Sequence, residues 1–329
     1  MNAFRVARIA VSAPRWSATP SRGAKTKARP QQSYNPPAQR RTNPHLESFK
    51  AEQQQQAKGR GHGISPRVQT AFAAGMLGIG LYCGLIYTSY KKEVAKSQSL
   101  DIPRDVSDRY NVTASSFDAD VETSEKVMRI GAKRKALLQL ARGHTLEVSC
   151  GTGRNLEFYE LGERRGVDGK GHAQVSGCRS VTFVDLSPQM VEITRRKFES
   201  LYPDFHFATF RAQDAGAVQP PSTATLHHYD TIVQTMGLCS MPDPVATLRH
   251  LGSITEPRRG RILLLEHGRS HYDWVNRILD NLAAAHADRH GCWWNRDIGE
   301  IIRESGLEVV EEQRYHLGTT YRYVLRPKT

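Results

Sequence analysis

The stretch LEVSCGTGRN, residues 146–155, has the residue types and spacing of a nucleotide-binding turn. A strand that carries Glu147 is followed by a small turn with Gly151 and Gly153. The dinucleotide-binding pattern Gly-x-Gly-x-x-Gly fails, because no register that begins at Ser149 or Gly151 supplies three glycines at this spacing. The turn is therefore not expected to hold a pyrophosphate.

The acid in this strand favours a different ligand. A negative Glu147 would repel a pyrophosphate but attract an ammonium group, which suits a cofactor with an amino-acid end, a ribose and a sulfonium, namely S-adenosylmethionine. A carboxylate can lie against the backbone N–H groups that begin a helix, here expected near position 154. Asp185, at the end of the next strand, can accept bonds from both ribose hydroxyls, and Gln213, Asp214 and Ala215 are placed to meet the adenine amino group.

Alternating strands and helices must position these residues. Strands are expected to end near positions 150, 185, 212, 235 and 267, each followed by a turn or helix, with a closing pair of strands after position 306. This order predicts an α/β fold with a doubly wound, mostly parallel, seven-stranded sheet, which binds ligands past the carboxyl ends of its strands. Residues 161–180 are polar and rich in glycine, so we expect a surface insertion there.

Four segments, LEVSCGTGRN, VDLSPQMVE, QDA and YDTIVQTMGLCSM, resemble in order the cofactor-site motifs of class I S-adenosylmethionine-dependent methyltransferases. The resemblance runs from about residue 110 to 329 and is strongest to the ubiquinone/menaquinone-type and thiol methyltransferase-like branch, whose motifs match GLCSMPDP and LLLEHG. The whole chain resembles the fungal mitochondrial inner-membrane methyltransferase-like family. With the reasoning above, the resemblance implies these cofactor-binding residues: Glu147, Ser149, Gly151, Gly153, Asn155, Asp185, Leu186, Met190, Gln213, Asp214, Ala215, Thr235 and Leu238.

His267 is the candidate catalytic residue, because it follows the fifth strand on the ligand side of the sheet. It would act as a general base if the acceptor is a phenol or a thiol, and an amine acceptor would need none. A purely structural histidine is the alternative. Cys239 is expected to be a packed small residue and not a nucleophile, because methyl transfer from a sulfonium needs no covalent enzyme intermediate.

No metal site is predicted. His286 and His290 are spaced i,i+4 near Cys292, but without a third convincing ligand a solvated helix face is the favoured interpretation. Trp293 and Trp294 either line an acceptor pocket or simply pack. The five cysteines include no CxxC pair, so a disulfide framework is not expected.

The net charge of +13 belongs to the N-terminal part of the chain. Residues 1–67 hold 13 of the 46 Lys and Arg and two of the 33 Asp and Glu, which leaves a net +2 on the rest. A nucleic-acid partner is therefore not favoured, because phosphate binding needs a concentrated basic face on the folded part. Residues 1–45, basic, without an acid and amphipathic at the start, are typical of a mitochondrial transit peptide; a disordered basic tail is the alternative.

Residues 68–90 are uncharged and apolar, and as a helix they span about 34 Å, enough to cross a membrane. We therefore expect a polar, unstructured linker at 46–67, a transmembrane helix at 68–90, a juxtamembrane linker at 91–109 and a methyltransferase domain at 110–329. Gly80 and Gly84 form a GxxxG step that could pair two helices into a homodimer. A presequence followed by an arrested span would leave the C-terminal domain in the intermembrane space.

The sequence thus predicts a single-pass methyltransferase of the mitochondrial inner membrane. Its methyl acceptor is expected to be a membrane-associated small molecule, such as a quinone or a thiol, or a membrane protein. The alternative is a respiratory-complex assembly factor that uses the fold as a scaffold with little or no catalysis. Ser149 motivates this alternative, because it stands where a glycine is expected, and it costs little only if its φ is negative.

Overall fold

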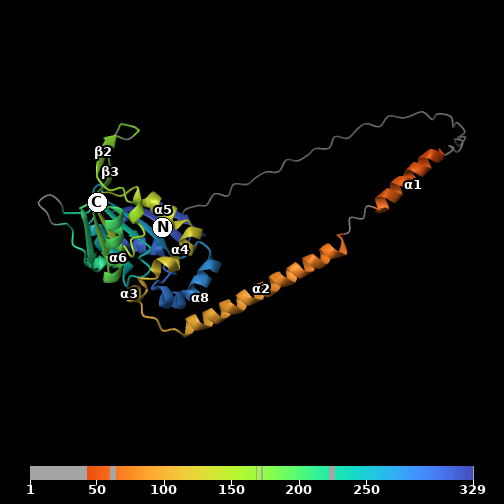
Figure 1. Cartoon of the computed structure of the whole chain (residues 1–329), viewed down its shortest axis with the longest axis horizontal. Coiled ribbons are helices and arrows are strands. Elements are labelled where there is room, and N and C mark those ends of the chain that lie inside the picture. Colours follow the sequence, from red (N-terminus) through yellow and green to blue (C-terminus); the bar gives the residue numbers. More distant parts are fainter. Residues whose placement is uncertain (1–42, 60–63, 168, 172, 222–226, 329) are drawn as a thin grey trace, which may run out of the picture. The chain divides into compact units, whose positions relative to one another are not determined.

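The computed structural model describes residues 43–59, 64–167, 169–171, 173–221 and 227–328, and the described residues divide into two units after Ala73 (Figure 1). The expected transit peptide lies almost wholly outside the described residues. Where an unstructured linker was expected, helix α1 (Pro44–Gly59) forms instead. Its Gln, Glu, Ala and Lys residues are good helix formers, and the Asn43 side chain accepts a bond from the backbone N–H of His45 at 3.1 Å, which caps the start.

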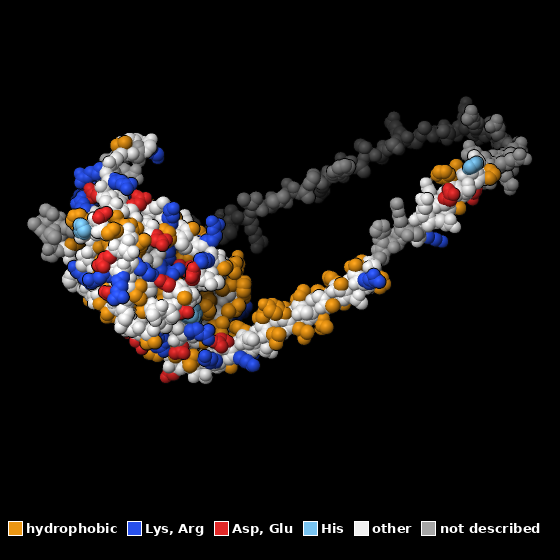
Figure 2. Space-filling view, viewed as in Figure 1, with side chains coloured by type: hydrophobic (Ala, Val, Ile, Leu, Met, Phe, Trp, Pro, Cys, Tyr) orange, Lys and Arg blue, Asp and Glu red, His pale blue; other side chains and the backbone are white. Residues whose placement is uncertain are grey.

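Helix α2 (Pro66–Ser99) contains the apolar run. Among the described residues it is the one helix that, by length and composition alone, could cross a membrane: an 18-residue window has mean hydropathy 1.6 and is entirely exposed. Figure 2 shows hydrophobic side chains along it.

The expected juxtamembrane linker is helical as far as Ser99, because α2 continues through it. Positions 90, 93 and 97 share one face of α2, and each bonds to helix α8 (Asp273–His290). The bonds are Asn281 Nδ2 to Tyr90 OH at 2.9 Å, Arg289 to Glu93 at 2.9 Å and Ala285 N–H to Ser97 Oγ at 3.2 Å. This part of the chain therefore packs on the domain and does not act as a linker.

The expected doubly wound, mostly parallel sheet is confirmed. Neighbouring strands run in the order β2-β3-β1-β5-β6-β8-β7, and β4 pairs with β3. In the described part of the chain the sheet has eight strands, one more than expected, because the glycine-rich insertion folds into an exposed hairpin of β2 with the start of β3, which projects from the domain (Figure 1). The strands are β1 (Arg142–Val148), β2 (Arg164–Val167), β3 (Ala173–Asp185), β4 (Ala208–Ala212), β5 (Thr231–Thr235), β6 (Arg261–His267), β7 (Glu308–Tyr315) and β8 (Thr320–Arg326).

Helices cover both faces of the sheet, so its central strands are apolar on both sides. In β6, for example, Leu264 belongs to one hydrophobic cluster and its neighbours Leu263 and Leu265 to the other. The first cluster includes residues of α7 (Pro244–Ser253) and α9 (Ile298–Ser305), and the second includes residues of α5 (Ile130–Leu138) and α6 (Pro188–Leu201). The remaining helices are α3 (Arg109–Thr113) and α4 (Phe117–Val127), with short 3₁₀ turns η1 (Leu156–Phe158) and η2 (Ala215–Ala217).

The helix expected to open near position 154 does not form. Only the 3₁₀ turn η1 follows the glycine-bearing turn, because the chain then enters the insertion that builds β2. The parallel register still brings the carboxyl ends of the strands to one edge: Val148 pairs with Val184, Asp185 with Ala212, and Thr235 with Leu265.

Candidate functional site

A pocket lies at the carboxyl edge of β1, β3, β4 and β5. Its volume is about 210 Å³, far above the roughly 10–15 Å³ that one water needs. Nine of the sequence-predicted residues line it: Ser149, Gly151, Asp185, Leu186, Met190, Gln213, Asp214, Ala215 and Thr235. Five do not: Glu147, Gly153, Asn155, Leu238 and His267.

The turn after β1 forms the floor of the pocket. Ser149, Gly151 and Gly153 have φ of 53°, 55° and 79°, in the left-handed region that favours glycine. A Cβ at Gly153 would lie 2.7 Å from Leu156 Cδ1, whereas a Cβ at Gly151 would meet no heavy atom within 4 Å. Gly151 therefore borders open space, while Gly153 is required by packing.

Ser149 was expected to cost little stability only if its φ were negative. Its φ is positive, so that condition is not met. A non-glycine residue held there costs about 1–3 kcal/mol. Its side chain is accommodated by Gly237, where a Cβ would lie 2.7 Å from Ser149 Oγ.

Asp185 ties the turn to the end of β3. Its two carboxylate oxygens accept bonds from the backbone N–H groups of Gly151 and Ser187, each at 2.9 Å. Burial raises the pKa of Asp185, although these two N–H groups act in the opposite direction. Each oxygen keeps a second lone pair, so the carboxylate can accept further bonds from a ligand in the pocket.

Glu147 lies behind the turn, in a buried polar network. Its carboxylate accepts bonds from Tyr159 OH at 2.6 Å and from Asn155 Nδ2 at 2.9 Å. Burial raises the pKa of Glu147 to about 7. Asn155 also donates to Thr235 Oγ1 at 3.0 Å and accepts from Arg134 at 3.0 Å. The network thus links the strand ends beneath the pocket.

In the segment after β4, Asp214 accepts a bond from the N–H of Gly216 at 2.9 Å and caps the start of η2. Gln213 donates from its backbone to the carbonyl of Asp185 at 2.9 Å and from its side chain to Ala217 O at 2.8 Å. Leu186 is exposed at the pocket edge, and Met190 of α6 is buried below it.

Helices α3 and α4 add a wall that the sequence did not predict, through Tyr110 and Phe117. A charge network fastens it to the turn: Asp118 accepts from Thr152 Oγ1 at 2.6 Å and from Arg154 at 3.0 Å, and Glu125 pairs with Arg154 at 2.8 Å.

Arg134 of α5 is a further pocket residue that the sequence did not predict. It is buried, bonds Thr235 Oγ1 at 2.5 Å and pairs with Glu125 at 2.8 Å. Arg134 lies on the same buried face of α5 as Ile130, Leu137 and Leu138. This helical spacing is the sequence pattern from which its burial could have been predicted.

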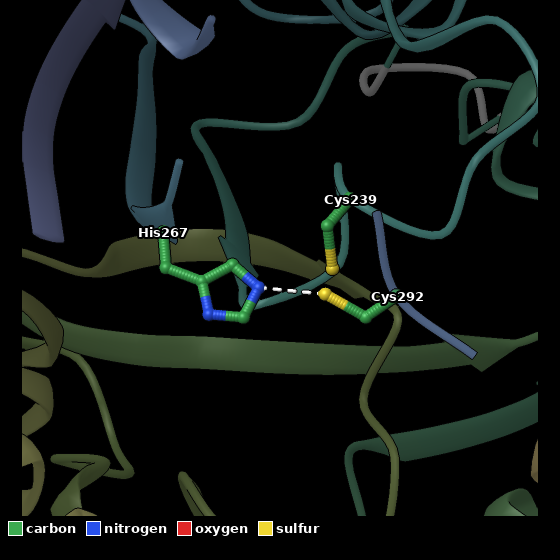
Figure 3. Close-up of side chains that lie close together, drawn as sticks. All are labelled: Cys239, His267 and Cys292. Atoms are coloured by element: carbon green, nitrogen blue, oxygen red, sulfur yellow. Dashed lines mark hydrogen bonds between the residues drawn. The ribbon is translucent and has the colours of Figure 1, made fainter. Parts of the chain in front are cut away.

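His267 does not face the pocket but a cluster of two cysteines. Its Nε2 lies 2.7 Å from Cys292 Sγ, and Cys239 Sγ lies beside both (Figure 3). The hydrogen bond from Cys292 lowers the pKa of Cys239 well below its usual range, and burial raises the pKa of Cys292. Burial alone would lower the pKa of His267, but the negative Cys239 raises it.

The solvated helix face expected for His286 and His290 is only partly correct, because His290 is exposed but His286 is half-buried, with its ring centroid 6.5 Å from that of His267. The His286 ring stacks on Trp294 at 3.9 Å between centroids, and His290 lies 4.7 Å from His286. Trp294 Nε1 donates to Leu279 O at 2.9 Å, and Trp293 Nε1 donates to Arg104 O at 3.2 Å.

Comparison with known proteins places this geometry in a family. A family model described as "Methyltransferase domain" matches residues 118–312. The yeast (Saccharomyces cerevisiae) protein "Methyltransferase OMS1, mitochondrial" is 39% identical over 235 residues, which are 68% of this chain and 47% of the relative. The chain therefore spans about half the length of this curated relative.

Among solved structures, DhpI in complex with SAH aligns at 17% identity, TM-score 0.45, over 69% of this chain and 97% of that one. Magnesium protoporphyrin IX methyltransferase from Synechocystis with bound SAM aligns at 15% identity, TM-score 0.36, over 62% and 78%.

Proposed function

The chain belongs to the methyltransferase-domain family, which confirms the resemblance seen in its sequence, and we propose that it transfers the methyl group of S-adenosylmethionine to an acceptor at the mitochondrial inner membrane. The observation that carries the proposal is the pocket at the carboxyl edge of the sheet, where the turn after β1, Asp185 and the segment after β4 meet.

The residues present fit this cofactor. The turn at Gly151 leaves open space where a side chain would stand, and the Nε of Arg134 is buried without a partner among the described residues. In our proposal Asp185 accepts bonds from the ribose hydroxyls, Arg134 faces the carboxylate of the amino-acid end, and Gln213 to Ala215 border the adenine. When bound, the cofactor supplies a methyl group on a positively charged sulfur.

The chain's own contribution is alignment and exclusion of water, which are most effective in a closed pocket. Tyr110 and Phe117 contribute a wall of the pocket from helices α3 and α4. Tyr110 OH lies 2.7 Å from Ser240 Oγ, so this wall is joined to the loop after β5. His267 does not line the pocket, and its Nε2 is bonded to Cys292, so a role as base would require an intervening group.

Location and acceptor extend the proposal. The basic, acid-free N-terminus, the helix α2 and the mitochondrial yeast relative together support a single-pass inner-membrane protein. We place the domain in the intermembrane space and favour a membrane-associated acceptor, a quinone, a thiol or a neighbouring membrane protein. The GxxxG step at Gly80 and Gly84 supports a homodimer through α2, since both glycines lie in its exposed stretch.

The test is calorimetric titration of the full chain, purified in detergent micelles, with S-adenosylmethionine. We expect saturable binding with one site per chain. A chain that is folded by circular dichroism but releases no binding heat would overturn the enzyme proposal and favour the scaffold alternative, for which the strained Ser149 is the supporting feature. Incubation of the binding-competent protein with radiolabelled methyl donor and mitochondrial lipid or protein fractions then identifies the acceptor.

A further inference from the structure

Three metal-ligating side chains from distant parts of the chain meet beside the pocket. Cys239 lies in the loop after β5, His267 ends β6, and Cys292 follows Gly291 at the end of α8. Figure 3 shows the imidazole edge and both sulfur atoms turned toward one another. Their nearest ligand atoms all lie within 4.8 Å of one another. Among the described residues, this is the one such group of three.

The backbone holds the three positions in place. The N–H of Trp293 donates to Cys239 O at 3.1 Å, which joins the loop of Cys292 to that of Cys239. Gly291 ends α8 in the left-handed conformation with φ of 66°, and a Cβ there would lie 3.1 Å from the ring of Tyr110. Cys239 and Cys292 are only 1% and 4% exposed. The two sulfur ligands are therefore pre-positioned and shielded from bulk water, and His267 is half-buried beside them.

The ligand set has a definite chemical preference. Two cysteine sulfurs and one imidazole suit soft or borderline divalent cations, and the set contains no carboxylate that would favour Mg²⁺ or Ca²⁺. Two thiolates also balance the charge of one divalent ion in a buried site. We propose that Cys239 Sγ, His267 Nε2 and Cys292 Sγ bind one Zn²⁺ ion.

The distances are compatible with a tetrahedral ion. Zn–S bonds of about 2.3 Å and Zn–N bonds of about 2.0–2.1 Å place ligand atoms roughly 3.5–3.8 Å apart. The observed 2.7 Å between His267 Nε2 and Cys292 Sγ must widen by about 1 Å, and all three ligand atoms already lie within 4.8 Å of one another. Side-chain rotation supplies such shifts. Three protein ligands leave the fourth position to a water or another small ligand.

The ion would fasten a wall of the pocket. Ser240 Oγ lies 3.5 Å from Cys239 Sγ and 2.7 Å from Tyr110 OH, and both Ser240 and Tyr110 line the pocket. A metal that joins the loop after β5 to β6 and to the end of α8 therefore holds this wall rigid. The site stands independently of methyl transfer, because none of its three ligands lines the pocket.

The experiment measures metal and not activity. The full chain is purified in detergent under reducing conditions, supplied with Zn²⁺, freed of loose metal, and its zinc content is determined by mass spectrometry. We expect one zinc per chain, retained in Cys178→Ala, which removes a buried cysteine outside the cluster, and lost in Cys292→Ala. Removing this ligand should weaken zinc binding by more than the ~10–100-fold that loss of a ligand's hydrogen-bond partner costs.

X-ray absorption on the wild-type chain gives a readout that no folding defect of a variant can affect. We expect two sulfur scatterers at about 2.3 Å and one histidine nitrogen at about 2.0–2.1 Å. The proposal is overturned if the reduced wild-type chain retains no stoichiometric zinc, if the bound zinc lacks sulfur ligands, or if Cys292→Ala keeps its metal. A resting disulfide between Cys239 and Cys292, seen by mass mapping of the non-reduced chain, would also overturn it.

Discussion

The substitution Asp185→Asn separates cofactor binding from fold stability. Asp185 accepts backbone N–H bonds on both oxygens, at 2.9 Å each, and offers its remaining lone pairs to the pocket. Asparagine keeps one acceptor oxygen and turns an NH₂ group toward the other N–H. Hydrogen bonds to a charged partner contribute about 1.5–3 kcal/mol each.

The expected loss differs between the two readouts. In the pocket, the side chain at position 185 would accept one hydrogen bond from the ribose hydroxyls in place of two, and its acceptor would no longer be charged. Binding therefore weakens by about 3 kcal/mol, roughly 100-fold in Kd. In the fold, the lost N–H bond is partly offset, because the neutral amide escapes the burial that raises the pKa of Asp185. We expect the free energy of unfolding to fall by only about 1–2 kcal/mol.

Titration calorimetry with S-adenosylmethionine and urea denaturation measure the two quantities on the full chain. Asp297→Asn is the matched control, because Asp297 caps α9 by accepting the N–H of Glu300 at 3.0 Å and does not line the pocket. The control should leave Kd unchanged. A folded Asp185→Asn chain whose Kd rises less than about threefold would show that this carboxylate does not hold the ribose.

Three further substitutions probe the site and its supports. Ser149→Gly should raise the free energy of unfolding by about 0.5–2 kcal/mol, measured by urea denaturation, because relief of the left-handed strain, about 1–3 kcal/mol, exceeds the added entropy of the unfolded chain, about 0.5–1 kcal/mol. A loss of stability would contradict the strain argument. Glu147→Gln should flatten the pH profile of stability: the folded pKa of about 7 exceeds the unfolded 4.5, so this group's contribution is complete below pH 4.5 and is lost as pH rises to about 7, by up to about 3 kcal/mol. Thermal unfolding from pH 5 to 8 checks it, and parallel profiles of wild type and variant would refute the assignment. Arg134→Met should destabilise the fold by about 1.5–3 kcal/mol, because Glu125 loses one of its two ion-pair partners and keeps Arg154. Arg164→Met in the exposed hairpin should change stability little, and equal denaturation midpoints for the two variants would oppose this account.

The sheet could be predicted because each central strand carries its own signal, a short apolar run followed by a turn. The residues at the strand ends followed from that order, since parallel strands bring their carboxyl ends together. The helix expected near position 154 could not be excluded in the same way. Local sequence after Gly153 permits a helix, and the insertion that diverts the chain acts through its pairing with β3.

The side chains that the sequence missed depend on tertiary paths. In the sequence Arg134 resembles the other basic residues of its helix, and only its spacing from the apolar residues of the same helix face indicates that it is buried. The cysteine–histidine cluster joins residues 28 and 25 positions apart, whereas pattern rules for metal sites look for close spacings such as that of His286 and His290. Only the meeting of β5, β6 and the end of α8 shows which histidine faces sulfur.

The unbroken helix α2 has a consequence for how the domain would meet its acceptor. A flexible tether would let the domain tumble and sample a volume set by the tether length. Here the last residue of the uncharged run, Tyr90, already contacts α8, and two more contacts follow within two helical turns. With α2 in a bilayer, the domain would lose independent rotation and stay within a thin layer at the lipid surface. Acceptors that diffuse in two dimensions would then meet the protein far more often than acceptors dissolved in the surrounding water.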